Sequence, residues 1–210
     1  MSSSGRYQTE HEAFWAGSFG DEYIARNDGA PHIASSLALF SRILSSTQRI
    51  DSVLEVGANI GLNLQALRQL LPSANLSAVE INAQAATRLR AIPGVEVHNA
   101  SLLDYQSAHT HDLTLAMGVL IHIAPDRLPD AYERLYAASR RYVCLVEYYN
   151  PVPVALPYRG HAERLYKRDF AGEMLDRYPD LRLVAYGFRY HRDPLFPMDD
   201  TNWFLLERQV

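Results

Sequence analysis

Residues Val53–Asn63 read Val-Leu-Glu-Val-Gly-Ala-Asn-Ile-Gly-Leu-Asn. The apolar run at the start is typical of a buried strand, and the periodicity of Ile60–Leu71 predicts a helix directly after it. Gly57 allows a sharp turn out of the strand, and Gly61 allows the helix to begin close to a ligand. Between them, Asn59 tolerates a positive φ better than most residues. The stretch therefore predicts a strand, a turn and a helix that together bind a ligand.

Strands and helices alternate around this stretch. The apolar runs predict strands at Ser52–Val56, Leu76–Ile81, Val95–Asn99, Asp112–Val119 and Tyr142–Tyr148, with further helices at Ala83–Ile92 and Asp126–Arg140. Such alternation implies right-handed crossovers and a parallel sheet. The end of the chain differs: after a helix at Asp169–Tyr178, the strands Leu181–Tyr190 and Asn202–Arg208 have no helix between them. We therefore expect an α/β fold that ends in an antiparallel hairpin.

The 210 residues fit a single domain. We expect residues 1–50 to form an N-terminal helical lid or cap region and residues 51–210 to form the α/β core. Trp15, Phe19 and Tyr23 share one helix face if the helix continues through Gly17 and Gly20. That face would close over a bound cofactor. Two residues of the segment, Tyr23 and Asn27, are expected to touch this cofactor, and Pro31 is expected to start the next helix.

Nucleotides bind beyond the carboxyl ends of the strands in such sheets. The turn lacks the G-x-G-x-x-G spacing of dinucleotide-binding proteins and the G-K-[ST] ending of a Walker A loop. Glu80 lies 19 residues beyond Gly61 at a strand end, where a carboxylate can accept hydrogen bonds from both ribose hydroxyls. Glu55 could receive a cationic amino group, and Ser101-Leu102 would lie at the edge of an adenine. These features predict a nucleotide-type ligand.

Three features together resemble the class I S-adenosylmethionine (SAM)-dependent methyltransferases: Glu55-x-Gly57-x-x-x-Gly61, Glu80, and Met117-Gly118-Val119-Leu120-Ile121-His122-Ile123. The match spans about Ser52–Val146 and departs at Asn59, where many members have glycine. The resemblance implies a Rossmann-like, seven-stranded, mostly parallel sheet whose last hairpin inserts one antiparallel strand. It implies SAM as the cofactor, with contacts from Glu55, Gly57, Asn59, Gly61, Glu80, Ile81, Ser101, Leu102, Met117 and Gly118.

A narrower resemblance covers nearly the whole chain. Phe14–Ile24, Glu147–Pro151, Tyr158–His161 and Lys167–Phe170 resemble methylases associated with pseudaminic acid biosynthesis. The family is named for its association with a pathway, which says little about its substrate. Together with the basic aromatic stretch described below, it makes a small, anionic acceptor the favoured class, with an acidic sugar or sugar nucleotide of a nonulosonic acid-type pathway as the expected example.

Two side chains are candidate catalytic bases. His122 follows the fourth strand directly, and its ordinary pKa of roughly 6.5 suits proton removal near neutrality. Glu147 ends the fifth strand and is the second candidate. The Asn-Pro-Pro-Tyr motif of many nucleic-acid amino-methyltransferases is absent after the fourth strand, which disfavours an adenine of DNA or RNA as the acceptor.

Aromatic and basic residues concentrate in Tyr148–Arg168 and Tyr186–Asp200. A basic loop on an acidic protein suits an anionic small molecule, and Arg159 could bind a carboxylate or phosphate bidentately. The predicted acceptor-binding residues are Tyr148, Tyr149, Tyr158, Arg159, His161, Lys167, Arg168, Tyr190 and His191. The acidic and histidine residues near His191 have no diagnostic ligand spacing, so no metal site is predicted.

Composition limits the partners. The net charge of −4 argues against a general nucleic-acid binder. No apolar run approaches the roughly 20 residues that span a bilayer, and Met1–Glu10 lacks the apolar region of a signal peptide. The lone Cys144 fits a reducing compartment. We expect a cytoplasmic monomer or homodimer. Three alternatives stay open: methyl transfer to a protein or RNA, a non-catalytic SAM-binding module, and an NAD-dependent enzyme.

Overall fold

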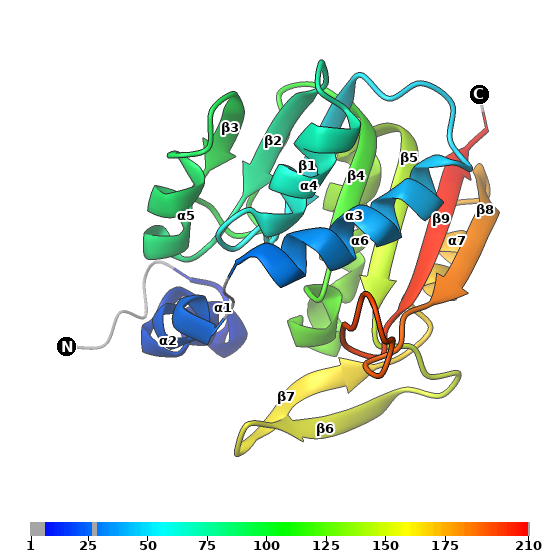
Figure 1. The fold of residues 1–210 in the computed structure, drawn as a ribbon. Coiled ribbons are helices and arrows are strands. Elements are labelled where there is room, and N and C mark those ends of the chain that lie inside the picture. The colour runs from blue at the N-terminus through cyan, green and yellow to red at the C-terminus, as the bar shows by residue number, and fades with distance from the viewer. Residues whose placement is uncertain (1–6, 27–28, 210) are drawn as a thin grey trace.

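The computed structural model describes residues 7–26 and 29–209. Its main sheet has seven strands in the order β3-β2-β1-β4-β5-β9-β8 (Figure 1). Strands β1 to β5 are parallel, and β9 lies antiparallel between β5 and β8. Their bounds are β1 Ser52–Val56, β2 Asn75–Val79, β3 Val95–His98, β4 His111–Met117, β5 Ser139–Glu147, β8 Leu181–Phe188 and β9 Asn202–Arg208. The predicted fold class and the predicted antiparallel hairpin are confirmed.

Helices cover both faces of this sheet (Figure 1). One face carries α3 (Ala30–Leu44), α4 (Leu62–Leu70) and α5 (Ala83–Leu89), and the other carries α6 (Leu128–Ala138) and α7 (Phe170–Arg177). Each layer has its own core of buried side chains. Phe40, Leu67 and Leu113 represent the first core, and Leu135, Val143 and Met174 represent the second. Burial on both faces explains why the parallel strands are continuous apolar runs.

Helix α3 packs in this core. It begins at Ala30 with Pro31 in its first turn, as predicted, because the fixed φ of proline suits a helix start. Its side chains Leu39, Phe40 and Ile43 pack in the same cluster as the sheet residue Val53. The lid or cap expected over residues 1–50 stays a prediction, and within that range α3 packs against the sheet.

Helices α1 (Glu10–Ala16) and α2 (Ser18–Arg26) precede α3. The helix does not continue through Gly17, whose extended backbone ends α1. The aromatic face survives this corner, since the Trp15 ring lies 5.3 Å from the rings of both Phe19 and Tyr23. Gly20 lies inside α2, where a Cβ atom would stand 1.9 Å from the backbone oxygen of Trp15. The tight corner therefore requires a glycine at position 20.

The stretch predicted as a basic loop forms a hairpin of its own. Strands β6 (Val154–Tyr158) and β7 (His161–Lys167) pair antiparallel in a separate two-stranded sheet. Arg159 and Gly160 form the turn with φ values of 48° and 87°. The prolines around β6 and its high exposure hid this strand from the sequence pattern.

Two short 3-10 helices, η1 (Leu120–His122) and η2 (Pro125–Arg127), link β4 to α6. The predicted helix at Asp126–Arg140 therefore begins with η2, and its last residues belong to β5. In the middle of β5, Cys144 is fully buried, as expected of a core thiol. Within the described ranges, the helices are all too short or too polar to cross a membrane.

Candidate functional site

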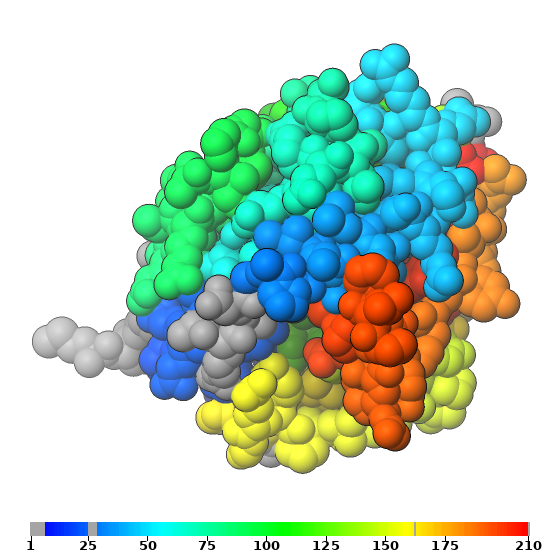
Figure 2. Space-filling model, viewed as in Figure 1, coloured from blue at the N-terminus to red at the C-terminus, as the bar shows by residue number. Residues whose placement is uncertain are grey.

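A cavity lies at the carboxyl ends of the strands. Helices α1 and α2, the β6–β7 hairpin and the loop after β8 wall it from three sides. Figure 2 shows the surface hollowed between the blue N-terminal helices, the yellow hairpin and the orange-red loop. Twelve of the sequence-predicted site residues line the cavity: Tyr23, Gly57, Asn59, Glu80, Ile81, Ser101, Leu102, Met117, Gly118, His122, Tyr148 and Tyr158.

The turn after β1 has the expected backbone. Gly57 and Asn59 have φ values of 62° and 48°, so the asparagine takes the left-handed conformation that the sequence required. A Cβ atom on Gly57 would lie 2.5 Å from the Val119 side chain. Gly61 serves another purpose than expected: it does not line the cavity, and a Cβ there would collide with Leu89 and Ile92. Gly61 lets α4 begin against the end of α5.

Glu80 faces the cavity from the end of β2 and is 6% exposed. Its Oε2 accepts a hydrogen bond from the Asn59 backbone N–H at 2.7 Å, and its Oε1 accepts one from Asn82 N–H at 2.7 Å. Burial raises the pKa of this carboxyl group above its ordinary value. A carboxylate offers about four lone-pair positions, so two remain for hydroxyl donors. The same residue therefore fixes the turn after β1 and can bind a diol.

Glu55 acts through a neighbour. Its carboxylate is 1% exposed and does not line the cavity. Oε1 accepts a hydrogen bond from Asn63 Nδ2 at 2.7 Å, and Asn63 Oδ1 accepts one from Ser36 Oγ at 2.9 Å. Burial raises the pKa of Glu55 to about 8. Asn63 itself lines the cavity, so the predicted contact of Glu55 with a ligand is replaced by an orienting contact with Asn63.

His122 lies in η1 with its ring inside an aromatic cluster. Its ring centroid is 4.6 Å from that of Trp15 and 4.8 Å from that of Tyr158. Nδ1 donates to the Arg164 carbonyl oxygen at 2.7 Å, which assigns the lone pair of the neutral ring to Nε2. Burial lowers the pKa of His122 to about 4. The sequence-based expectation of an ordinary pKa is therefore wrong, because η1 places the ring under α1 and the hairpin.

Glu147 lies behind the turn that carries His122. It is 3% exposed and does not line the cavity. Its Oε1 accepts hydrogen bonds from the backbone N–H groups of Val119 and Leu120, both at 3.0 Å. Burial raises the pKa of this carboxyl group to about 7. The contacts make Glu147 a positioning residue for the β4–η1 turn rather than a base in contact with a ligand.

The predicted basic side chains of the hairpin contact other protein groups. Lys167 Nζ lies 4.9 Å from the centre of the Tyr148 ring, and Arg168 Nε donates to Glu173 Oε1 at 2.6 Å. Arg159 is exposed and its guanidinium lies 5.8 Å from the centre of the Tyr158 ring. Among the described residues, none of these three cations lines the cavity.

The other predicted acceptor residues also lie outside the cavity lining. His161 packs its ring 4.9 Å from that of Phe14, and His191 Nδ1 lies 2.8 Å from Asp200 Oδ2. Tyr149 and Tyr190 are 38% and 46% exposed on the outer surface. Asn27, the second predicted lid contact, lies outside the described residues. In the part of the chain that the structure describes, no group of His, Cys, Asp or Glu side chains is arranged to hold a metal ion.

The cavity also contains Trp15 of the predicted lid face and two residues of the predicted Tyr186–Asp200 acceptor stretch, Arg189 and Asp199. Its lining further includes residues for which the sequence predicted no individual contact: His11, Glu12, His32, Asn63 and Asn82. Glu12 had a sequence signal, since Thr9 and Glu12 form a capping box at the start of α1. Its Oε1 is buried and has no hydrogen-bond partner among the described residues. Arg189 lies in the Tyr186–Asp200 stretch, but only the fold separates it from the exposed Arg192 of the same loop.

No protein-family model and no curated protein matches this sequence. Solved structures do resemble it. A Burkholderia thailandensis 1,6-didemethyltoxoflavin-N1-methyltransferase superposes with a TM-score of 0.69 at 15% identity, over 95% of this chain and 87% of the other. Its structure holds 1,6-didemethyltoxoflavin and S-adenosylhomocysteine (SAH).

Two further methyltransferase structures resemble this chain to a similar degree. Magnesium protoporphyrin IX methyltransferase from Synechocystis PCC 6803, with bound SAM, gives a TM-score of 0.67 at 13% identity over 97% of this chain and the whole of the other. A plantazolicin methyltransferase with SAH gives 0.66 at 10% identity over 95% of both chains. At these identities the likeness concerns the fold. This chain has the Rossmann-like fold of the class I SAM-dependent methyltransferases.

Proposed function

We propose that this chain is an enzyme that transfers the methyl group of SAM to a small acceptor that carries an anionic group. The single observation that carries the proposal is the cavity in which the turn of Gly57 and Asn59, the carboxylate of Glu80 and the neutral ring of His122 meet. An acidic sugar or sugar nucleotide is the acceptor class that we favour, on the resemblance to the pseudaminic acid-associated methylases.

The residues present fit SAM. Glu80 has lone pairs left for the two ribose hydroxyls, and Ser101 and Leu102 offer a half-polar edge for adenine. Met117 and Gly118 lie at the end of β4, next to the turn after β1. The amino group of the methionine part would meet the Asn63 amide that Glu55 orients. SAM, when bound, supplies a methyl group that is already activated by its sulfonium charge.

The protein's own part is to position the acceptor, to exclude water and to take up one proton. As the acceptor oxygen bonds to the methyl carbon and the carbon–sulfur bond breaks, a hydroxyl acceptor becomes strongly acidic. Nε2 of His122 can accept this proton even with its pKa near 4, because the proton leaves a positively charged oxygen. A carboxylate acceptor needs no base, and His122 would then only orient it.

The first test is binding of SAH by calorimetry. Wild-type protein is expected to bind, and Glu80→Ala is expected to weaken binding about tenfold to a hundredfold, because charged hydrogen bonds to hydroxyls are lost. Glu133→Ala, on the exposed side of α6, is the matched control. Absence of binding to folded wild-type protein at millimolar SAM or SAH would refute the proposal.

The second test identifies the acceptor. The protein is incubated with labelled SAM and a panel of nonulosonic acids and sugar nucleotides, and products are read by mass spectrometry for the gain of one methylene group. Turnover with a neutral sugar but with none of the acidic sugars would contradict the anionic acceptor while leaving methyl transfer intact.

A further inference from the structure

Arg189 is a cation held inside the cavity. It follows β8 directly, and its backbone N–H donates to the Thr201 carbonyl oxygen at 2.8 Å, which fixes where the side chain begins. Nη1 lies 3.8 Å from the sulfur of Met117. Nη2 is buried and has no hydrogen-bond partner in the described part of the chain. A buried guanidinium nitrogen that lacks a hydrogen-bond partner costs free energy, so an anion that accepts from Nη2 would be favoured at this position.

One acidic side chain of the cavity, Asp199, acts electrostatically on Arg189 and favours its charged form. Asp199 is exposed to solvent, and no hydrogen bond between its carboxylate and the Arg189 guanidinium is present among the described residues. Burial lowers the pKa of Arg189 to about 10, so the side chain stays cationic at neutral pH. Burial and the nearby Arg189 lower the pKa of His32 below its ordinary value.

The position of Arg189 along the sheet separates it from the nucleoside end of the cavity. Its neighbour Met117 is the last residue of β4, and Tyr148, which acts on its charge, follows β5, whereas Glu80 follows β2. The order β2-β1-β4-β5 places three strand spacings between the ends of β2 and β5. At about 4.8 Å each, this amounts to roughly 14 Å. Arg189 therefore lies toward the side on which an acceptor would approach the methyl group.

We propose that Arg189 binds a carboxylate or phosphate group of the methyl acceptor. This inference rests on the proposed function and names the residue that selects the acceptor class. The planar guanidinium can bind such a group bidentately, and the anion would supply the partner that Nη2 lacks. Arg159, the residue expected from the sequence to do this, is exposed outside the cavity.

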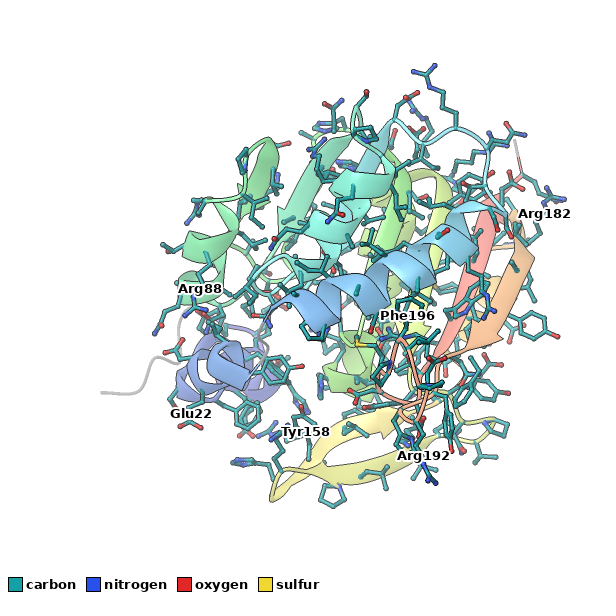
Figure 3. The ribbon with its side chains drawn as sticks, viewed as in Figure 1. Glu22, Arg88, Tyr158, Arg182, Arg192 and Phe196 are labelled. Carbon is teal, nitrogen blue, oxygen red and sulfur yellow. The ribbon has the colours of Figure 1, made fainter. Side chains whose placement is uncertain are left out.

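The test uses benzoate as the carboxylate probe and benzamide as its neutral counterpart, titrated calorimetrically with and without SAH. Wild-type protein is expected to bind benzoate at least about tenfold more tightly than benzamide, as for a charged hydrogen bond. Arg189→Met should remove this difference. Arg192→Met is the control, since Arg192 is exposed at the outer side of the same loop (Figure 3). This variant should keep the preference for benzoate over benzamide.

Three outcomes overturn the inference: wild-type protein that does not prefer benzoate, an Arg189→Met variant that keeps the preference, or an Arg192→Met variant that loses it. Arg189→Lys keeps the positive charge but not the planar guanidinium that binds bidentately. It is expected to lose part of the preference for benzoate. Melting temperatures of all variants check that they fold.

The affinity for SAH distinguishes the two possible sources of the anion, the acceptor and the methionine part of the cofactor. If Arg189 serves the acceptor, Arg189→Met binds SAH within about threefold of wild type. A tenfold loss of SAH affinity would assign Arg189 to the carboxylate of the methionine part and overturn the acceptor assignment. Failure of wild-type protein to bind SAH refutes the proposed function, whereas the benzoate titration without SAH still tests the anion site.

Discussion

At the scale of single residues, the two candidate bases, His122 and Glu147, differ in which of their polar atoms are already hydrogen-bonded. His122 lines the cavity, and the lone pair of its neutral ring lies on Nε2 because Nδ1 donates to the Arg164 carbonyl oxygen. Oε1 of Glu147 accepts hydrogen bonds from two backbone N–H groups, and its Oε2 is buried without a hydrogen-bond partner among the described residues. The sequence placed both at strand ends and could not distinguish a side chain that enters the cavity from one that supports its wall.

The buried carboxyl group of Glu147 predicts a pH-dependent stability. Its pKa of about 7 in the folded protein exceeds its ordinary value of 4.5, so the folded chain holds this proton to higher pH than the unfolded chain. The contribution is fully present below pH 4.5 and is lost as the pH rises through 7. Relative to Glu147→Gln, wild type should lose roughly 3 kcal/mol of unfolding free energy between these limits.

Urea unfolding of wild type and Glu147→Gln at pH 5 and pH 8 measures this difference. Glu133→Gln, an exposed position on α6, is the matched control and should follow wild type. Parallel pH dependences of wild type and Glu147→Gln would contradict the raised pKa.

At the scale of elements, the corner between α1 and α2 determines the wall of the cavity. Trp15 reaches the His122 and Tyr158 rings from the end of α1, and α2 returns close beneath it at Gly20. In Figure 3 Tyr158 lies between the hairpin and these two helices. Asn82 ties the corner to the sheet by donating to Asp21 Oδ1 at 2.8 Å.

Gly20→Ala is expected to open this corner. Alanine in a helix interior ordinarily stabilises by about 1 kcal/mol relative to glycine. Here the added Cβ would stand 1.9 Å from the Trp15 backbone oxygen, so we expect destabilisation of about 1–3 kcal/mol and faster proteolysis of the N-terminal segment. Ser18→Ala in the same helix, at an exposed position, is the control. An equal or slower rate of cleavage in Gly20→Ala would refute the tight corner.

At the scale of the whole molecule, the sheet separates two cores that share no side chain. Leu67 of α4 and Leu135 of α6 are both fully buried, on opposite faces. Leu67→Val and Leu135→Val should each lower the unfolding free energy by about 1 kcal/mol, the value of one buried methylene. The double variant should lose the sum within about 0.5 kcal/mol, because the two sites share no partner.

Denaturant unfolding of the two single variants and the double variant measures this additivity. Leu183→Val, at a side chain that is 44% exposed on β8, should change stability little. A coupling well above the stated margin would mean that the two layers adjust to each other through the sheet.

The local pattern of the sequence determined the fold and the part of the candidate site around the turn after β1 and Glu80. Continuous apolar runs and the Gly57–Asn59 turn are signals within a few residues, and Glu80 follows its strand directly. These local features become strands, turns and strand ends in the structure. Hairpin β6–β7 was not predicted, because the prolines and the high exposure of β6 leave no apolar run that is typical of a strand.

Only the tertiary structure decided which polar side chains enter the cavity. Arg159, Arg189 and Arg192 are equivalent in sequence chemistry, yet Arg189 alone of the three lines the cavity. The position of a side chain depends on what packs over it from distant parts of the chain, as α1 and the hairpin pack over His122. Burial by such distant segments also changed the pKa of His122, because desolvation depends on three-dimensional surroundings and not on neighbours in sequence.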